Sequence, residues 1–127
     1  MKRLFIFAGV LFVMGIGVTG CYKDVILPTA GADPNAPPVQ YSFKTDIAPL
    51  LNTKCALSGC HVAGAQAPDL ETAASYNSLV NGGFVNTLIP AQSDLYIMIN
   101  GDMQVHIPSA ADRQKIYDWI RTGAINN

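Results

Sequence analysis

With 127 residues, the chain has room for one small domain but not for several. Half of the residues are hydrophobic and only 13% are charged, although part of this apolar excess lies in the first twenty residues. The formal net charge is −1 and no basic patch is present, which excludes the usual electrostatic footprint of a nucleic-acid-binding protein.

The first twenty residues have the features of an export signal. Lys2 and Arg3 form a short basic start, and the uncharged run over residues 4–18 is shorter than the roughly 20 residues that a membrane span needs. The segment Val18-Thr19-Gly20-Cys21 resembles the lipobox of bacterial lipoproteins. This resemblance implies a signal peptide over residues 1–20, lipidation of Cys21 and stable anchoring by several acyl chains. An ordinary secretory leader and an uncleaved anchor are the alternatives.

Residues 21–40 are predicted to form a lipid-anchored tether. The segment is rich in proline and glycine, and no helical or strand period runs through it. Each proline fixes its own φ angle and lacks an amide donor, so a semi-extended spacer is expected. A loop packed on the domain is the alternative. The domain itself then covers residues 41–127.

The domain is predicted to begin with a helix over residues 43–51. Phe43, Ile47, Leu50 and Leu51 share an apolar stripe along it. Proline is tolerated only in the first turn of a helix, so the position of Pro49 favours Thr45 over Ser42 as the N-cap.

Three further helices are expected, over residues 72–80, 94–99 and 110–122. Ser93 and Ser109 are the predicted N-caps of the last two, and Gly123 is the predicted C-terminal stop. Trp119 lies on the apolar face of the last helix, together with Ile116 and Ile120. No stretch shows sustained alternation of period two, so the domain is predicted to be all-α.

The run from Cys55 to His61 contains the candidate chemistry. A Cys-x-x-Cys-His sequence is the attachment signature of c-type haem, but here four residues separate Cys55 from Cys60. Attachment needs two thiols that reach the two vinyl groups of one porphyrin, and an imidazole directly beneath the iron. Cys60 and His61 are adjacent, as this requires, and the extra pair of residues can loop out because Gly59 makes a turn easier.

Two alternatives do not involve haem. A Cys55–Cys60 disulfide is permitted in an exported binding lipoprotein. Zinc could be held by Cys55, Cys60, His61 and His106, but the adjacent Cys60 and His61 cannot easily face one small ion.

The order of motifs over residues 41–127 resembles small monohaem c-type cytochromes of the class I type, as found in planctomycetes and Bacteroidetes. The matching features are an aromatic-Asp-Ile-x-Pro-Leu helix, a cysteine–histidine run, a short leucine-containing helix, a Pro-x-x-Ser-x-Leu-Tyr turn, a methionine loop and a terminal Trp-Ile-x-x-Gly-Ala helix. In this chain they occupy residues 43–51, 55–61, 70–80, 90–96, Met103 and 119–124. The resemblance implies a cytochrome c-like bundle of short helices around one covalent haem c.

The resemblance also implies roles for individual residues. Cys55 and Cys60 would form the haem thioethers, and His61 would be the proximal iron ligand. Met103 is the expected distal ligand, although Gln104 follows it where the family has proline.

The distal ligand has other candidates. His106 is the alternative to Met103, and Met98 or an open iron position is the remaining possibility. Met98 is expected to lie in the core, because it shares a helical face with Leu95 and Ile99.

The resemblance suggests roles beyond the iron ligands for two more residues. The Pro68 carbonyl is a candidate acceptor for the His61 Nδ1–H, an interaction that fixes the tautomer of a ligating histidine. The alternative is a plain turn proline. Trp119 is expected near the haem edge, beside the first helix.

The expected function is therefore electron transfer rather than enzymatic catalysis. The protein would be lipid-anchored in a bacterial cell envelope, facing the periplasm or the cell exterior. Its partners would be redox proteins of the envelope and the membrane itself. The functional alternatives are a haem-based ligand-binding or sensor lipoprotein and a haem-free, disulfide-containing binding lipoprotein.

Overall fold

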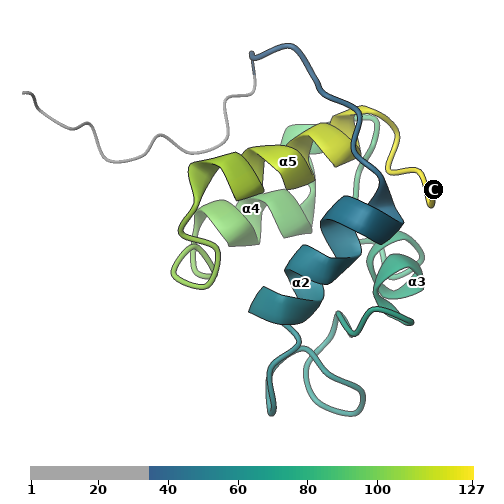
Figure 1. Ribbon diagram of the computed structural model, residues 1–127, viewed down its shortest axis with the longest axis vertical. Coiled ribbons are helices and arrows are strands. Elements are labelled where there is room, and N and C mark those ends of the chain that lie inside the picture. The colour runs from purple at the N-terminus through teal and green to yellow at the C-terminus, as the bar shows by residue number, and fades with distance from the viewer. Residues whose placement is uncertain (1–34) are drawn as a thin grey trace, which may run out of the picture.

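The computed structural model describes residues 35–127, so the predicted signal peptide and Cys21 lie outside the described residues. Figure 1 shows a bundle of short helices, and no strand is present between residues 35 and 127. The all-α prediction is confirmed for this part of the chain. None of the helices in it has the length and apolar character needed to cross a membrane.

The first helical segment begins at Phe43, as the predicted range has it, but with a different N-cap. A π-helical turn, η1 (Phe43–Ile47), runs into α2 (Ala48–Lys54), and Ser42 is the N-cap because its Oγ accepts a hydrogen bond from the Thr45 amide at 3.4 Å. The prediction of Thr45 as N-cap is therefore wrong. The Ile47 amide reaches back five residues to the Ser42 carbonyl at 3.3 Å. This wider turn leaves Pro49 in the first turn of α2, where its missing amide breaks no helical hydrogen bond.

The helix α3 (Ser75–Val80) is shorter than predicted. The amides of Ala74 and Ser75 both donate to the Glu71 carbonyl, at 2.9 and 2.8 Å. Residues 72–74 consequently form a turn, and the helix starts only at Ser75.

Two helices follow in the second half of the chain. The 3₁₀ turn η2 (Pro90–Gln92) leads into α4 (Asp94–Asn100), and α5 (Ala110–Arg121) is the longest helix. Ser109 caps α5 as predicted, accepting a hydrogen bond from the Asp112 amide at 3.2 Å. Ser93 stands at the N-cap position of α4, but its hydroxyl accepts from the Asn86 amide at 2.9 Å instead, so its predicted role as a side-chain cap is wrong.

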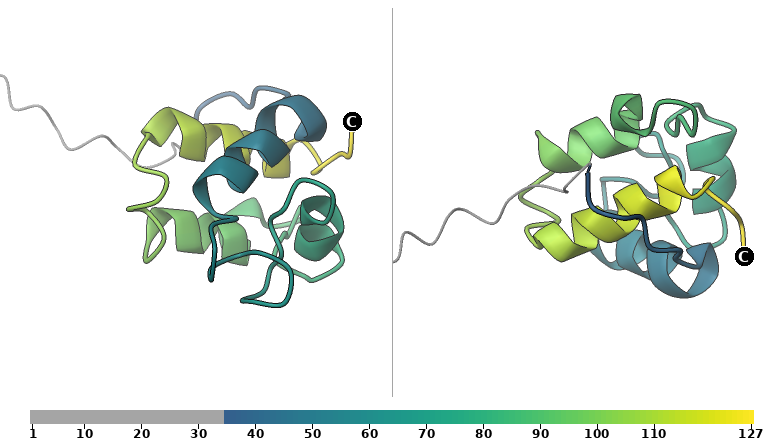
Figure 2. Two further views of the ribbon diagram at one scale, coloured as in Figure 1. Left: turned by 60° about the horizontal axis from the view of Figure 1, so that its bottom comes forward. Right: turned by 90° about the horizontal axis from the view of Figure 1, so that it is seen from above.

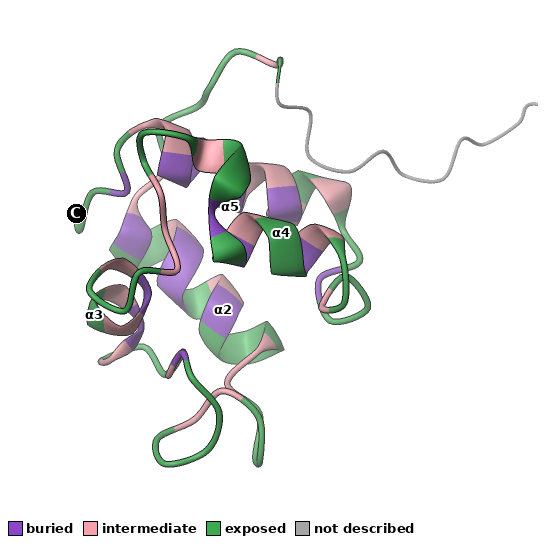
Figure 3. Ribbon diagram, turned by 180° about the vertical axis from the view of Figure 1, so that it is seen from behind, coloured by how far each residue is buried: buried purple, intermediate pink, exposed green. Residues whose placement is uncertain are grey.

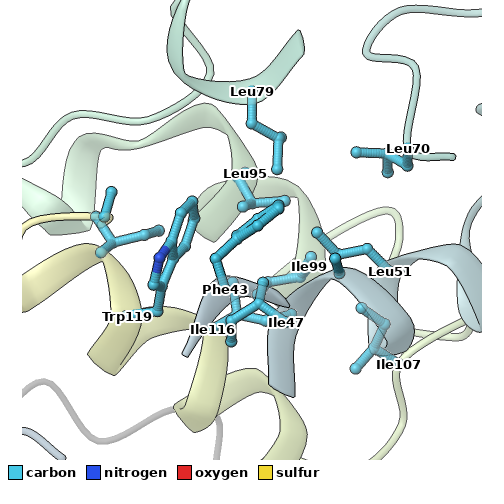
Figure 4. Close-up of a cluster of buried hydrophobic side chains, with 13 residues drawn as sticks. Phe43, Ile47, Leu51, Leu70, Leu79, Leu95, Ile99, Ile107, Ile116 and Trp119 are labelled. Carbon is cyan, nitrogen blue, oxygen red and sulfur yellow. The ribbon is translucent and has the colours of Figure 1, made fainter. Parts of the chain in front are cut away.

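The helices α4 and α5 lie side by side and run in opposite directions (Figures 1 and 2). The segment η1–α2 packs against α5, and α3 packs against α2. Figure 4 shows the core side chains that meet between them. Ile116, Trp119 and Ile120 are fully buried, which confirms the predicted inner face of the last helix.

The last residues of the predicted tether contact the domain. The Val39 amide donates to Asp118 Oδ2 at 3.2 Å, and Arg121 Nη2 donates to the Ala36 carbonyl at 2.5 Å. Asp118 and Arg121 also form a salt bridge at 2.8 Å. Residues 36–39 are thus held on α5, and the packed-loop alternative applies to this part of the tether.

Candidate functional site

The run from Cys55 to His61 folds into a tight loop directly after α2. The His61 amide donates to the Cys55 carbonyl at 3.3 Å, which brings the two ends of the motif together. Between them, the Cys60 amide closes a turn onto the Leu57 carbonyl at 2.8 Å, and Gly59 adopts a φ of +80°. This conformation disfavours residues other than glycine. The extra residues of the motif therefore loop out as predicted, and Figure 3 shows this part of the chain as largely exposed.

The imidazole of His61 is oriented by a backbone carbonyl. Its Nδ1 lies 3.0 Å from the Pro68 oxygen. A carbonyl oxygen can only accept, so Nδ1 carries a proton, and in the neutral imidazole the free lone pair lies on Nε2. The predicted partner of His61 is thus present, and the ring is held in the tautomer that a metal-ligating Nε2 requires. The Leu70 amide also donates to the His61 carbonyl at 2.8 Å, which holds this segment in place.

An open cavity of about 510 Å³ lies beside this loop. Its volume falls within the roughly 300–1,000 Å³ typical of small-molecule and cofactor sites. Cys55, Cys60 and His61 line one side of it. Apolar side chains from the segments around α3 and α4 line much of the rest: Leu70, Leu79, Phe84, Leu95 and Ile99.

Candidate distal ligands line the same cavity, from a separate segment of the chain. Met103 and His106 lie in the loop between α4 and α5, and both contribute to the lining. Met98 on α4 also lines the cavity and is 39% exposed. The expectation that Met98 belongs to the core is therefore wrong: Leu95, Met98 and Ile99 all line the cavity, but the packing of α4 buries Leu95 and Ile99 and leaves Met98 exposed. The structure brings together all three side chains considered for the distal position.

The two thiols of the loop differ in their environment. Both Cys55 and Cys60 are free, so the disulfide alternative is not formed in this structure. Cys60 is exposed, whereas Cys55 is half-buried. Burial, reinforced by the neighbouring Cys60, raises the pKa of Cys55 from 9.0 to about 11. Its thiol is consequently protonated at neutral pH.

Between residues 35 and 127, no group of three or more histidine, cysteine, aspartate or glutamate side chains is arranged to hold a metal ion. The four-residue zinc site considered from the sequence is not formed there.

Trp119 lies elsewhere in the domain. Its ring packs on Phe43 of η1, with centroids 5.1 Å apart, and its Nε1 donates to the Ile125 carbonyl at 3.1 Å. The expected neighbourhood of the first helix is confirmed. However, Trp119 does not line the cavity, so its placement at a haem edge is not supported.

Sequence reasoning missed several residues of the cavity. Leu57 and Ile97 line it and remain 46% and 53% exposed, which places large apolar side chains at its mouth. Leu57 belongs to the looped-out part of the motif. Ile97 lies off the apolar stripe of α4, and an apolar residue on the outer side of a short helix is the signal that could have identified it.

Comparison with known proteins finds no family model, curated protein or solved structure that matches this chain.

Proposed function

We propose that residues 41–127 form a small c-type cytochrome domain that carries one covalent haem c and transfers single electrons. The observation that carries the proposal is the cavity, which is lined by Cys55, Cys60 and His61 together with Met98, Met103 and His106. Cofactor sites are concave and mostly apolar, with a small number of polar groups. The open, mostly apolar cavity of about 510 Å³ beside the cysteine–histidine loop supports the proposal on this ground.

The residues present fit a haem. The Cys55 and Cys60 sulfurs would form the two thioethers, and His61 Nε2 would be the proximal ligand. Met103 is the proposed distal ligand, with His106 as the alternative. When bound, a haem iron with both axial positions filled takes up and releases single electrons.

The chain itself would do three things at this site. The Pro68 carbonyl accepts a hydrogen bond from Nδ1 of His61, so that the lone pair of the neutral imidazole lies on Nε2. The apolar lining, which includes Leu70, Leu79 and Ile99, would cover the apolar face of a bound porphyrin. A methionine in the distal position would raise the reduction potential relative to a second histidine.

The proposed location in the cell envelope rests on the sequence alone. Cys21 would be lipidated and would anchor the domain to a membrane, facing the periplasm or the cell exterior. The partners would then be redox proteins of the envelope.

The decisive experiment expresses the full chain in a host with cytochrome c maturation machinery and stains for haem after denaturing electrophoresis. The wild-type chain should keep haem covalently bound, and Cys55→Ala or Cys60→Ala should reduce the stain at least tenfold. Cys21→Ser is the matched control, because it removes a cysteine outside the Cys55–His61 run. It should release the protein from the membrane fraction but retain the haem. A wild-type chain without bound haem would refute the proposal.

The haem-based sensor is distinguished by the state of the distal position. Carbon monoxide should change the spectrum of the reduced wild-type protein only slowly if a side chain occupies that position. An immediate change would favour a ligand-binding function over electron transfer.

A further inference from the structure

A buried arginine lies next to the loop that carries Met103 and His106. Arg113, in the first half of α5, is completely buried. Its guanidinium stays protonated under all ordinary conditions. No carboxylate between residues 35 and 127 forms an ion pair with it. An isolated charge is unfavourable in a protein interior unless polar groups surround it, so the groups that it does contact need an explanation.

Arg113 bonds both ends of the loop between α4 and α5. Its Nε donates to Asn100 Oδ1 at 3.2 Å, at the end of α4. Its Nη1 donates to the carbonyls of Ile107 and Pro108, at 2.7 and 2.8 Å, where the loop returns to α5. Asn100 is itself oriented, because its Nδ2 donates to the Tyr96 carbonyl at 2.9 Å. The guanidinium therefore joins the two ends of the segment over residues 101–107, which we call the distal loop.

Within the distal loop, short-range hydrogen bonds make one folded unit. The Met103 amide donates to the Met98 carbonyl at 2.9 Å, and the His106 amide donates to the Met103 carbonyl at 3.0 Å. Few of its side chains pack against the domain, because Gln104, Val105 and His106 are exposed. Ile107 is its one fully buried side chain, and the Ile107 carbonyl is the acceptor that Arg113 contacts at the shortest distance.

We infer that Arg113 is a positioning residue, which fixes the distal loop at both ends and thereby determines how Met103 and His106 enter the cavity. The planar guanidinium suits this role because its N–H groups point in several fixed directions from one buried point. Charge-assisted hydrogen bonds are also stronger than neutral ones. This inference rests on the proposed function for its link to iron ligation, but the effect on the loop does not depend on haem.

The first test follows the loop itself by hydrogen exchange of the full chain, in whichever haem state it is purified. In Arg113→Met, the amides of Met103 and His106 should exchange at least tenfold faster than in the wild type. Arg113→Lys, which keeps one charged donor, should recover part of the protection. Asn100→Ala removes only one of the three acceptors and should give a smaller acceleration.

Lys115→Met is the matched control. It removes a cation from the same helix, but Lys115 lies over the Tyr41 ring, with Nζ 5.7 Å from its centroid, and not against the distal loop. This variant should leave the Met103 and His106 amides protected. The inference is overturned if those amides exchange at the wild-type rate in a folded Arg113→Met protein. It is equally overturned if the amides of α2 accelerate as much as those of the loop, because Arg113 would then support the whole fold.

The second test addresses ligand positioning in the haem-loaded chain. Reduced Arg113→Met should bind carbon monoxide at least tenfold faster than the wild type and Lys115→Met, and Arg113→Lys should restore part of the difference. Unchanged carbon monoxide kinetics in Arg113→Met would overturn the link to the distal position. A wild-type chain that holds no covalent haem would refute the proposed function instead, and the exchange comparison would still decide the role of Arg113.

Discussion

The domain has an aromatic half and a cavity half, which are packed in different ways. In the aromatic half, the Phe43 ring lies 5.1 Å from both Tyr76 and Trp119, measured between centroids, and Phe43 and Trp119 are buried. In the cavity half, the loop from Cys55 to His61 and the distal loop border an open space of about 510 Å³. One amphipathic segment, η1–α2, spans both halves. Phe43 at its start belongs to the aromatic half, and the last residues of α2 reach the cavity half.

This difference separates the part that holds the fold from the part proposed to hold a ligand. Close packing of aromatic side chains supplies most of the stability that a small core can have. The cavity half gives up close packing and relies on backbone turns, the His61–Pro68 hydrogen bond and Arg113 to keep its shape. Substitutions in the two halves should therefore have different consequences.

The largest effect is expected in the aromatic half. Trp119→Ala should reduce the free energy of unfolding by about 3–5 kcal/mol, because it removes a fully buried indole and leaves a void. Since small domains have about 5–15 kcal/mol in total, much of the variant should be unfolded under mild denaturant. Urea unfolding followed by circular dichroism measures the loss. Met98→Ala, at the cavity, should change the stability of the haem-free chain by less than about 1 kcal/mol. Equal losses in the two variants would remove the distinction between the halves.

Filling the cavity should have the next largest effect. Covalently bound haem should raise the free energy of unfolding by about 2 kcal/mol or more, because it removes apolar surface of the cavity from water. For a domain of this size, that corresponds to an increase in Tm of roughly 8–16 °C. Thermal unfolding of the haem-loaded and haem-free chains measures it. An identical Tm for both would show that the cavity half is rigid without its occupant.

The two thiols of the cavity half should react at different rates. Burial raises the pKa of Cys55 to about 11, and only the thiolate attacks an alkylating reagent. In the haem-free chain near pH 8, Cys55 should be alkylated roughly tenfold more slowly than the exposed Cys60, a factor that allows for the partial exposure of Cys55. Its rate should keep rising with pH until about pH 11, since the thiolate fraction increases up to the pKa. Mass spectrometry of iodoacetamide-treated protein at several pH values measures both rates, and a Cys55 rate that levels off near pH 9 would contradict the burial effect.

The smallest effect on stability is expected at the candidate distal ligands. Met103→Ala and His106→Ala should each change the unfolding free energy by less than about 1 kcal/mol, because these side chains are partly or largely exposed. Only the variant that removes the ligand should change the absorption spectrum of the haem-loaded protein, and we expect this to be Met103→Ala. His61→Ala serves as the reference for loss of a ligand on the proximal side. A spectrum changed by His106→Ala and not by Met103→Ala would reassign the distal position.

Local sequence signals predicted much of the fold. Ser109 caps the last helix as expected, and Gly123, with a φ of +101°, follows its end. The turn at Gly59 was also predicted, and the resemblance to small cytochromes made Pro68 a candidate partner of His61. These features depend on residues that are close together in sequence, so their chemistry is visible without the rest of the chain.

The errors have a common physical cause. Serine is a favourable N-cap residue, but the hydroxyl of Ser93 accepts its hydrogen bond from the Asn86 amide and not from an amide of α4. Met98 shares an apolar stripe with Leu95 and Ile99. In a helix as short as α4 this stripe is only two turns long, so the packing of neighbouring segments decides which of its side chains are buried. Propensity is a weak guide when tertiary partners compete for the same group.

The sequence by itself determined the helical character of the domain and suggested the residues of the proposed haem site, because helix caps, apolar periodicity and the Cys55–His61 run are all local. Only the tertiary structure decided which side chains share the cavity and which lie in the aromatic half. It placed Met98 at the cavity and Trp119 away from it, and it buried Arg113 against the distal loop. These outcomes depend on how segments far apart in the chain pack against one another, and no single stretch of residues contains that information.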